Sequence, residues 1–160
     1  MNLEIERKFL CNLTEEEAKK LAFYYKEIHS TYLANTETSS FRIVKEINPY
    51  GIVSCKTTHK ESVINSIARK ETENNISQIV YDSIDHKSFP TISKKRYLIK
   101  HNGNIWEVDF FKTYSFVIAE LEFISEERAL EFKDFPSWLT KEVTKDPYYL
   151  NCNLASFQRY

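Results

Sequence analysis

Acidic residues recur in pairs at a spacing of two along the chain. The acidic set comprises Glu4, Glu6, Glu71, Glu73, Glu107, Asp109, Glu120 and Glu122. In a β-strand, side chains two residues apart point to the same face and lie about 6–7 Å apart. Carboxylates held that close repel each other unless a cation neutralises them. The repeated pairs therefore favour a hard divalent cation, Mg²⁺ or Mn²⁺, which binds carboxylate oxygens and keeps several waters.

Basic residues occupy the same alternating positions in other predicted strands, and this pattern favours a polyanionic ligand. The chain has only two glycines, Gly51 and Gly103, so a glycine-rich phosphate loop is excluded. A metal and a set of lysines and arginines without such a loop indicate a phosphate chain held by side chains. Each acidic pair alone also fits an ordinary solvated strand face, where ion pairs contribute little. A purely structural domain therefore stays open at this point.

Alternation of apolar and polar residues predicts strands over most of the chain. The predicted strands are 2–10, 29–35, 39–47, 51–59, 64–73, 91–101, 104–111 and 115–124, and the predicted helices are 13–25, 74–86, 125–132 and 150–158. Thr14 followed by Glu17 has the spacing of a capping box. Asn102-Gly103 predicts a type I′ hairpin turn between two of the strands.

Antiparallel strands in this number form either a sandwich or a barrel. In strand after strand, one predicted face is apolar and the other carries charge, as in "IWEVDF" and "AELEF". A barrel accommodates this pattern if its charged faces surround a wet interior and its apolar faces lie outward under the helices. That arrangement is inside-out relative to an ordinary small barrel.

Composition limits the class of protein. The 160 residues suit a single domain, 1–160, and the content of 42% hydrophobic and 28% charged residues is ordinary for a soluble chain. No apolar run approaches the roughly 18–20 residues of a membrane span, and the N-terminus lacks the apolar segment of a signal peptide. Cys11, Cys55 and Cys152 are far apart, which predicts free thiols and a cytoplasmic location. The net charge of −1 gives no overall basic footprint for nucleic acid.

The N-terminal sequence "EIERKF" resembles the E-x-E-x-K signature of the CYTH superfamily, the triphosphate tunnel metalloenzymes. The chain then follows the family's order through "FRIV", "SCK", "ARKETE", "SKKRY", "WEVDFF", "AELEF" and "EVTKDPYYLNCNLA". The similarity covers essentially the whole chain and looks closest to the short bacterial branch. It implies a mainly β fold, namely a closed eight-stranded antiparallel barrel around a charged tunnel, with a few peripheral helices.

The resemblance also implies an enzyme, a metal-dependent triphosphatase that uses Mg²⁺ or Mn²⁺. A triphosphate-bearing small molecule, foremost inorganic tripolyphosphate, is the implied substrate. Thiamine triphosphate, or ATP in a class IV adenylyl cyclase reaction, are the alternatives. The implied metal ligands are Glu4, Glu6, Asp109, Glu120 and Glu122, and the implied phosphate-binding residues are Lys8, Arg42, Lys56, Arg69, Lys94 and Arg96. Glu4 or Glu6 is expected to orient the attacking water, and Lys56 to act on the leaving side. Family members are often dimers, so a homodimer is a further expectation.

Two positions depart from the family pattern. Val44 stands where the second arginine of an R-x-R strand is expected, and Leu150 stands where the C-terminal helix often has a basic residue. Losing one charge-assisted contact costs about 1–3 kcal/mol. Lys45 is adjacent, but its side chain should point to the other face unless a bulge intervenes. The alternative function is therefore a tunnel that binds polyphosphate or a nucleoside triphosphate without turnover, although the complete set of acids favours an enzyme.

Overall fold

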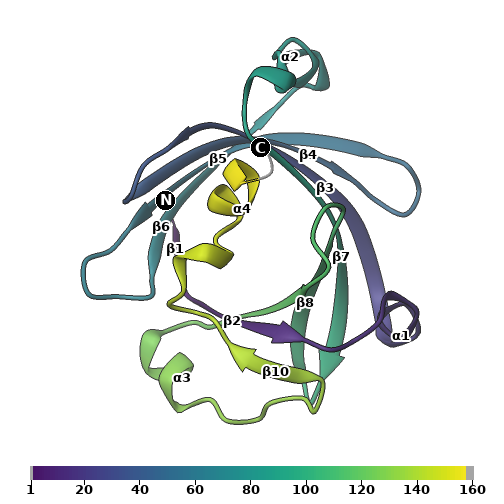
Figure 1. Cartoon of the computed structure of the whole chain (residues 1–160), viewed down its shortest axis with the longest axis vertical. Helices are drawn as coiled ribbons and strands as arrows, with labels where there is room; N and C mark the ends of the chain where they lie inside the picture. Colours follow the sequence, from purple (N-terminus) through teal and green to yellow (C-terminus); the bar gives the residue numbers. More distant parts are fainter. Residues whose placement is uncertain (1, 158–160) are drawn as a thin grey trace.

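The computed structural model describes residues 2–157 and folds them mainly into one large antiparallel sheet (Figure 1). The strands are β1 (Asn2–Glu4), β2 (Glu6–Cys11), β3 (Ala22–Asn35), β4 (Ser39–Ile47), β5 (Val53–Ser62), β6 (Arg69–Ile76), β7 (Thr91–His101), β8 (Asn104–Phe111), β9 (Val117–Glu122) and β10 (Leu139–Glu142). The α-helices are α1 (Glu15–Leu21), α2 (Gln78–Asp82), α3 (Glu126–Glu131) and α4 (Asn151–Phe157), with 3-10 turns η1 (His86–Ser88) and η2 (Pro147–Tyr149). The prediction of a mainly β, antiparallel fold with few helices is confirmed.

The sheet is not the closed eight-stranded barrel that the sequence predicts. It has ten strands in the order β1-β6-β5-β4-β3-β7-β8-β9-β2-β10, so its hydrogen-bonded order has two ends. One reason is that the N-terminal segment changes partner at Ile5. β1 pairs with β6 and β2 pairs with β9, so one predicted strand becomes two. The other reason is β10, a short strand that the sequence does not predict and that adds to the edge at β2. The sheet nevertheless curves around a central space, with this N-terminal segment contacting both β6 and β9 (Figure 1).

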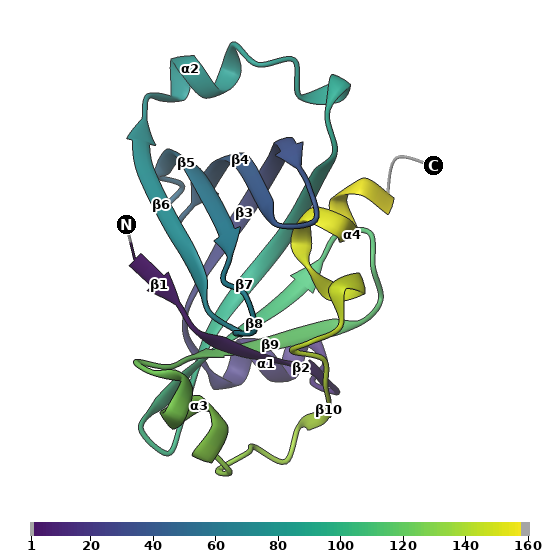
Figure 2. The ribbon, with the colours of Figure 1, turned by 90° about the vertical axis from the view of Figure 1, so that its left-hand side faces the viewer.

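Local signals place most turns and caps correctly. Thr14 Oγ1 accepts from the Glu17 amide and Glu17 accepts from the Thr14 amide, which confirms the capping box of α1. Asn102 and Gly103 have φ angles of 48° and 82°, as a type I′ turn requires. α2 and α3 lie at opposite ends of the molecule (Figures 1 and 2). Over residues 2–157, the helices are too short or too polar to cross a membrane.

Two predicted helices are too long. The helix predicted over 13–25 ends at Leu21, because residues 22–25, which include three aromatic side chains suited to strands, already pair with β7. The helix predicted over 74–86 shrinks to Gln78–Asp82, since β6 continues to Ile76 by pairing with β5. The last helix agrees with its prediction up to Phe157, and Gln158 lies outside the described residues.

The apolar core lies largely outside the curved sheet. The largest buried cluster gathers outward-facing side chains of β2, β7, β8 and β9, among them Phe9, Trp106 and Ala119. Ala18 of α1 and Trp138 pack onto this cluster from outside. Lys8, Glu107 and Glu120 alternate with these apolar residues and therefore point to the opposite, inner face. The predicted inside-out arrangement is thus observed.

At one end the inner face becomes apolar, and α4 covers it. Leu154 and Ala155 of α4 are fully buried against Tyr32, Ile92 and Ile118, which belong to three different strands of the sheet. Figures 1 and 2 show α4 lying over this part of the sheet. The charged part of the inner face is thereby left as a cavity bounded by the strands and by the start of α4.

Candidate functional site

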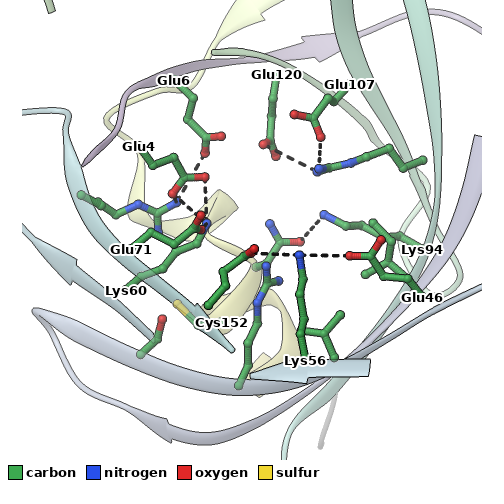
Figure 3. A pocket seen from close by; sticks show the side chains of 18 of the residues that line it. Glu4, Glu6, Glu46, Lys56, Lys60, Glu71, Lys94, Glu107, Glu120 and Cys152 are labelled. Atoms are coloured by element: carbon green, nitrogen blue, oxygen red, sulfur yellow. Dashed lines mark hydrogen bonds and ion pairs between the residues drawn. The ribbon is translucent and has the colours of Figure 1, made fainter. Parts of the chain in front are cut away.

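A cavity of about 270 Å³ opens inside the curved sheet and is lined mostly by charged side chains (Figure 3). The acidic lining residues are Glu4, Glu6, Glu46, Glu71, Glu73, Glu107, Glu120 and Glu122, and the basic ones are Lys26, Arg42, Lys56, Lys60, Arg69, Lys94 and Arg96. They come from all strands except β10. Alternation explains this directly, because within each strand every second side chain points inward.

Three carboxylates converge on the side of the cavity formed by β1, β2 and β9. One oxygen each of Glu4, Glu6 and Glu122 lies within 4.8 Å of the others. Glu6 and Glu122 are direct cross-strand partners, and Glu4 lies two residues before Glu6. We call these three residues the carboxylate trio. Nearby, Glu120 Oε1 is buried without a hydrogen-bond partner among the described residues. This oxygen-only donor set fits a hard divalent cation.

The trio carries charge repulsion that a cation would relieve. Burial first, and then the nearby Glu120 and Glu4, raise the pKa of Glu6 well above its usual value. Burial, and then Glu107 and Glu4, also raise the pKa of Glu122. Glu4 behaves differently: burial alone would raise its pKa, but Lys60 and Arg69 outweigh burial and lower it. Nearby cations therefore do not offset the burial and repulsion of Glu6 and Glu122, and a bound divalent cation would.

Glu120 of β9 lies between the trio and two cations, Lys8 of β2 and Arg96 of β7. Its oxygens lie 3.8 Å from Lys8 Nζ and 3.7 Å from Arg96 Nη2. Burial alone would raise the pKa of Glu120, but Lys8, Arg96 and Lys94 hold it well below its usual value. Glu120 is therefore ionised and already partly neutralised by side chains.

A buried ion cluster underlies the β7–β8 wall. Asp109 is 0% exposed and accepts from Lys94 Nζ at 2.6 Å and from Arg96 Nε and Nη2 at 2.7 and 2.8 Å. Arg96 also pairs with Glu107. Lys94 Nζ donates in addition to Asn151 Oδ1 at the start of α4, at 3.2 Å. The cluster fixes the directions of two cations that border the cavity.

The opposite wall, β3 to β6, holds its cations in a chain of ion pairs. Lys26 Nζ lies 2.5 Å from Glu46, and Lys56 Nζ lies 3.2 Å from Glu46 and 2.9 Å from Glu73. Burial alone would lower the pKa of Lys56, but Glu73 and Glu46 outweigh burial and raise it, so this lysine is charged. Its charge is divided between two acids.

Arg42 differs from the other lining cations because the described residues give it no carboxylate partner. Its Nη1 donates to Ser30 Oγ at 3.3 Å and to Tyr32 Oη at 3.4 Å, and its Nε is buried without a partner within residues 2–157. An arginine in this state is a strong attractor for an anion.

The structure brings most of the predicted site residues to one cavity. Those that line it are Glu4, Glu6, Arg42, Lys56, Arg69, Lys94, Arg96, Glu120 and Glu122. Two others lie behind its wall. Lys8 is 5% exposed and donates to the Tyr149 carbonyl at 3.1 Å, and Asp109 faces Lys94 and Arg96 rather than the trio.

Three charged lining residues escape the sequence analysis. Lys26 is missed because the helix predicted over 13–25 ends one residue before it and the next predicted strand starts only at 29. Glu46 and Lys60 have the same parity as Arg42 and Lys56 on their strands, so alternation was a signal that could have found them. The strand predicted over 39–47 coincides with β4, whereas the strand predicted over 51–59 stops one residue before Lys60, because β5 continues to Ser62.

The two positions that depart from the family pattern, Val44 and Leu150, bring no positive charge into the cavity. Val44 is 1% exposed and lines the cavity, so no cation replaces the missing arginine at that position. Lys45 points to the outer face, where its Nζ lies 5.3 Å from the ring centre of Tyr81. Leu150 packs against the apolar cluster around α4.

Together, fold and cavity define a class of protein: a small antiparallel β protein whose curved sheet places carboxylates opposite lysine and arginine side chains. No family model matches the sequence. The chain is 33% identical over 161 residues to an inorganic triphosphatase of Acetivibrio thermocellus, a match that covers 97% of this chain and 94% of the relative. The chain belongs to the CYTH superfamily, the triphosphate tunnel metalloenzymes.

Solved structures agree with this assignment. The crystal structure of the inorganic triphosphatase NE1496 is similar with 27% sequence identity and a TM-score of 0.61, over 97% of this chain and 95% of that one. The PH1012 protein from Pyrococcus horikoshii OT3 shares the fold, with 20% identity and a TM-score of 0.55 over 78% of this chain and 82% of that one.

Proposed function

We propose that this protein is a divalent-metal-dependent triphosphatase that hydrolyses inorganic tripolyphosphate inside the cavity, with residues 1–160 as one catalytic domain. The observation that carries the proposal is the carboxylate trio facing a wall of cations across one cavity. The similarity to two inorganic triphosphatases supports the substrate, and the absence of a glycine-rich loop means that side chains hold the phosphates. The free thiols of Cys11, Cys55 and Cys152 fit the cytoplasm as its location.

In this proposal, Glu4, Glu6 and Glu122 hold Mg²⁺ or Mn²⁺, with Glu120 beside them. A bound cation would neutralise charge on the phosphate oxygens and make the phosphorus atom more susceptible to attack by water. Asp109 is a positioning residue for Lys94 and Arg96 and not a ligand, because both its oxygens already accept from those cations.

The chain's own residues bind and orient the substrate. Arg42, which lacks a carboxylate partner among the described residues, offers the most available positive charge for a phosphate group. Arg96 and Lys94 face the same space from the β7 wall and are held rigid by Asp109. Fixed cations of this kind stabilise the negative charge that spreads over the transferred phosphoryl group. Glu4 or Glu6 orients the attacking water in this proposal, because both carboxylates lie in the trio next to the expected metal.

The direct test measures phosphate release from tripolyphosphate by the purified protein with Mg²⁺, with Mn²⁺ and with EDTA. We expect release with either metal and none with EDTA. ATP and thiamine triphosphate are assayed in parallel, since the alternatives within the family act on those compounds. A folded protein that releases no phosphate from tripolyphosphate with either metal would contradict the proposal. Cyclic AMP formation from ATP would reassign the reaction.

Substituting Val44 tests the predicted position of the phosphate chain. Val44→Arg adds a cation to the cavity wall beside Arg42, and we expect the KM for tripolyphosphate to fall about tenfold, the equivalent of one charge-assisted contact. Thr57→Arg is the matched control, because Thr57 pairs with Ile43 and therefore shares its outward face. An unchanged KM in a V44R protein with normal thermal stability would mean that the phosphates bind elsewhere in the cavity.

A further inference from the structure

Lys60 lies directly on a member of the carboxylate trio. Its Nζ donates a hydrogen bond to Glu4 Oε1 at 2.9 Å and lies 2.8 Å from Glu4 Oε2, which accepts no hydrogen bond within residues 2–157, so the ammonium group is close to both oxygens. The Lys60 and Glu4 side chains are 14% and 9% exposed, so water screens the pair little. Figure 3 shows Lys60, Glu71 and Glu4 on the same side of the cavity, as expected from the strand order β1-β6-β5.

The same ammonium group has a second partner on its own side. Glu71 is the cross-strand neighbour of Lys60, and its carboxylate lies 3.3 Å from Lys60 Nζ. Lys60 is therefore balanced between an acid of the trio and an acid outside it. A small movement toward Glu71 would leave both Glu4 oxygens open on that side without leaving Lys60 unpaired.

A divalent cation and Lys60 compete for the same oxygens. A divalent cation bound to Glu4 would lie close to the Lys60 ammonium group, and two positive charges that share one carboxylate repel each other. Arg69 also approaches Glu4 and Glu6, but at 3.3 and 3.4 Å it engages each acid through one nitrogen only. Lys60 is the more closely bound of the two.

We propose that Lys60 is a resident cation of the metal site: it occupies Glu4 in the metal-free protein, moves to Glu71 when a divalent cation binds, and thereby lowers the affinity for that cation. The inference rests on the proposed function only in assigning the trio to a metal. It assigns to Lys60 a role in setting metal affinity that is separate from holding phosphate.

Lys56 provides a matched comparison. It is also a cavity lysine with two carboxylate partners, but those partners are Glu46 and Glu73, neither of which belongs to the trio. Removing either lysine changes the cavity charge by the same amount. A difference between the two variants therefore reports direct competition at Glu4 and not the overall potential of the cavity.

The test is calorimetric titration of the protein with Mn²⁺ alone, in the absence of any phosphate. We expect Lys60→Gln to bind Mn²⁺ about tenfold more tightly than wild type, because one charge-assisted hydrogen bond no longer has to be broken. Lys56→Gln should change the affinity much less. Glu71→Gln should weaken Mn²⁺ binding more than Glu73→Gln. Without the Glu71 carboxylate, Lys60 keeps Glu4 as its acidic partner and has no second acid to move to. Thermal denaturation of each metal-free variant checks that it is folded.

The outcomes separate the inference from the proposed function. If wild type binds Mn²⁺ and Lys60→Gln binds it no more tightly, or if both lysine variants gain equally, the role of Lys60 is overturned while the metal site stands. If neither wild type nor Lys60→Gln binds Mn²⁺, the metal site itself is absent and both proposals fall.

Discussion

Replacing Glu122 by glutamine is expected to lower the rate of tripolyphosphate hydrolysis at least about a hundredfold at fixed Mg²⁺ or Mn²⁺. Glu122 contributes one of the three converging carboxylate oxygens, and no lysine or arginine ion pair satisfies it in the described structure. Glutamine keeps the size of the side chain but removes its charge, so the site loses one anionic ligand. The measurement is kcat and KM for tripolyphosphate across a metal titration.

The same substitution should not weaken the fold, and this separates a functional from a structural effect. Burial and the nearby Glu107 and Glu4 raise the pKa of Glu122, so its negative charge opposes folding at neutral pH. The metal-free Glu122→Gln protein is therefore expected to unfold at the same temperature as wild type or higher. Glu127→Gln, on the exposed side of α3, is the control and should leave the rate unchanged. A fully active Glu122→Gln enzyme would remove Glu122 from the site.

The sequence predicts the strands well because alternation is strong in this protein. Outward positions such as Trp106 and Ala119 are fully buried, and inward positions such as Glu107 and Glu120 carry charge, so the period of two is visible in the letters. β10 is missed entirely, because its four residues "LTKE" show no apolar alternation and pair only with β2. A short exposed edge strand is determined by its partner and not by its own sequence.

Alternation cannot predict whether the sheet closes into a barrel. Ile5 interrupts the first strand although its neighbours on both sides continue the same pattern. It is the pairing of β1 with β6 and of β2 with β9 that divides the segment, and this pairing depends on strands more than sixty residues away. Local sequence contains no signal for such a change of partner.

Within the site, alternation gives the face of a residue but not its depth. Asp109 and Glu107 share an inward parity, yet Glu107 lines the cavity while Asp109 is enclosed by Lys94 and Arg96. The difference arises because Lys94 and Arg96 cover Asp109, and Lys94 in turn donates to Asn151 at the start of α4. These contacts connect distant segments, so the sequence pattern does not predict which inward position they will cover. The sequence-based expectation of a metal ligand at Asp109 is therefore replaced by our proposal that it positions cations.

This role of Asp109 leads to the second large expected effect. Asp109→Asn leaves Lys94 and Arg96 buried with one acceptor oxygen in place of two, and turns an amide donor toward cations. Removing one partner of a buried ion cluster costs about 3–5 kcal/mol, which lowers the melting temperature of a chain of this size by about 10 °C or more. The measurement is thermal or urea denaturation at neutral pH.

The loss of stability in Asp109→Asn should also depend on pH in a defined direction. Burial alone would raise the pKa of Asp109, but Arg96 and Lys94 outweigh burial and lower it. A carboxyl group with a lowered pKa stabilises the fold above its unfolded value of about 3.9, and this contribution is lost as the pH falls through the folded value. The difference in unfolding free energy between wild type and Asp109→Asn should therefore be full at neutral pH and shrink only in strong acid.

A double substitution tests whether the loss comes from the ion cluster. Adding Lys94→Met to Asp109→Asn removes one of the two stranded cations, so the double variant should be more stable than the sum of the two single losses predicts. Asp82→Asn, at the exposed end of α2, is the matched control and should change stability by less than about 0.5 kcal/mol. Strict additivity, or an Asp109→Asn protein as stable as wild type, would mean that Asp109 does not hold Lys94 and Arg96 in place. The cations of the β7 wall would then have to be positioned by the substrate itself.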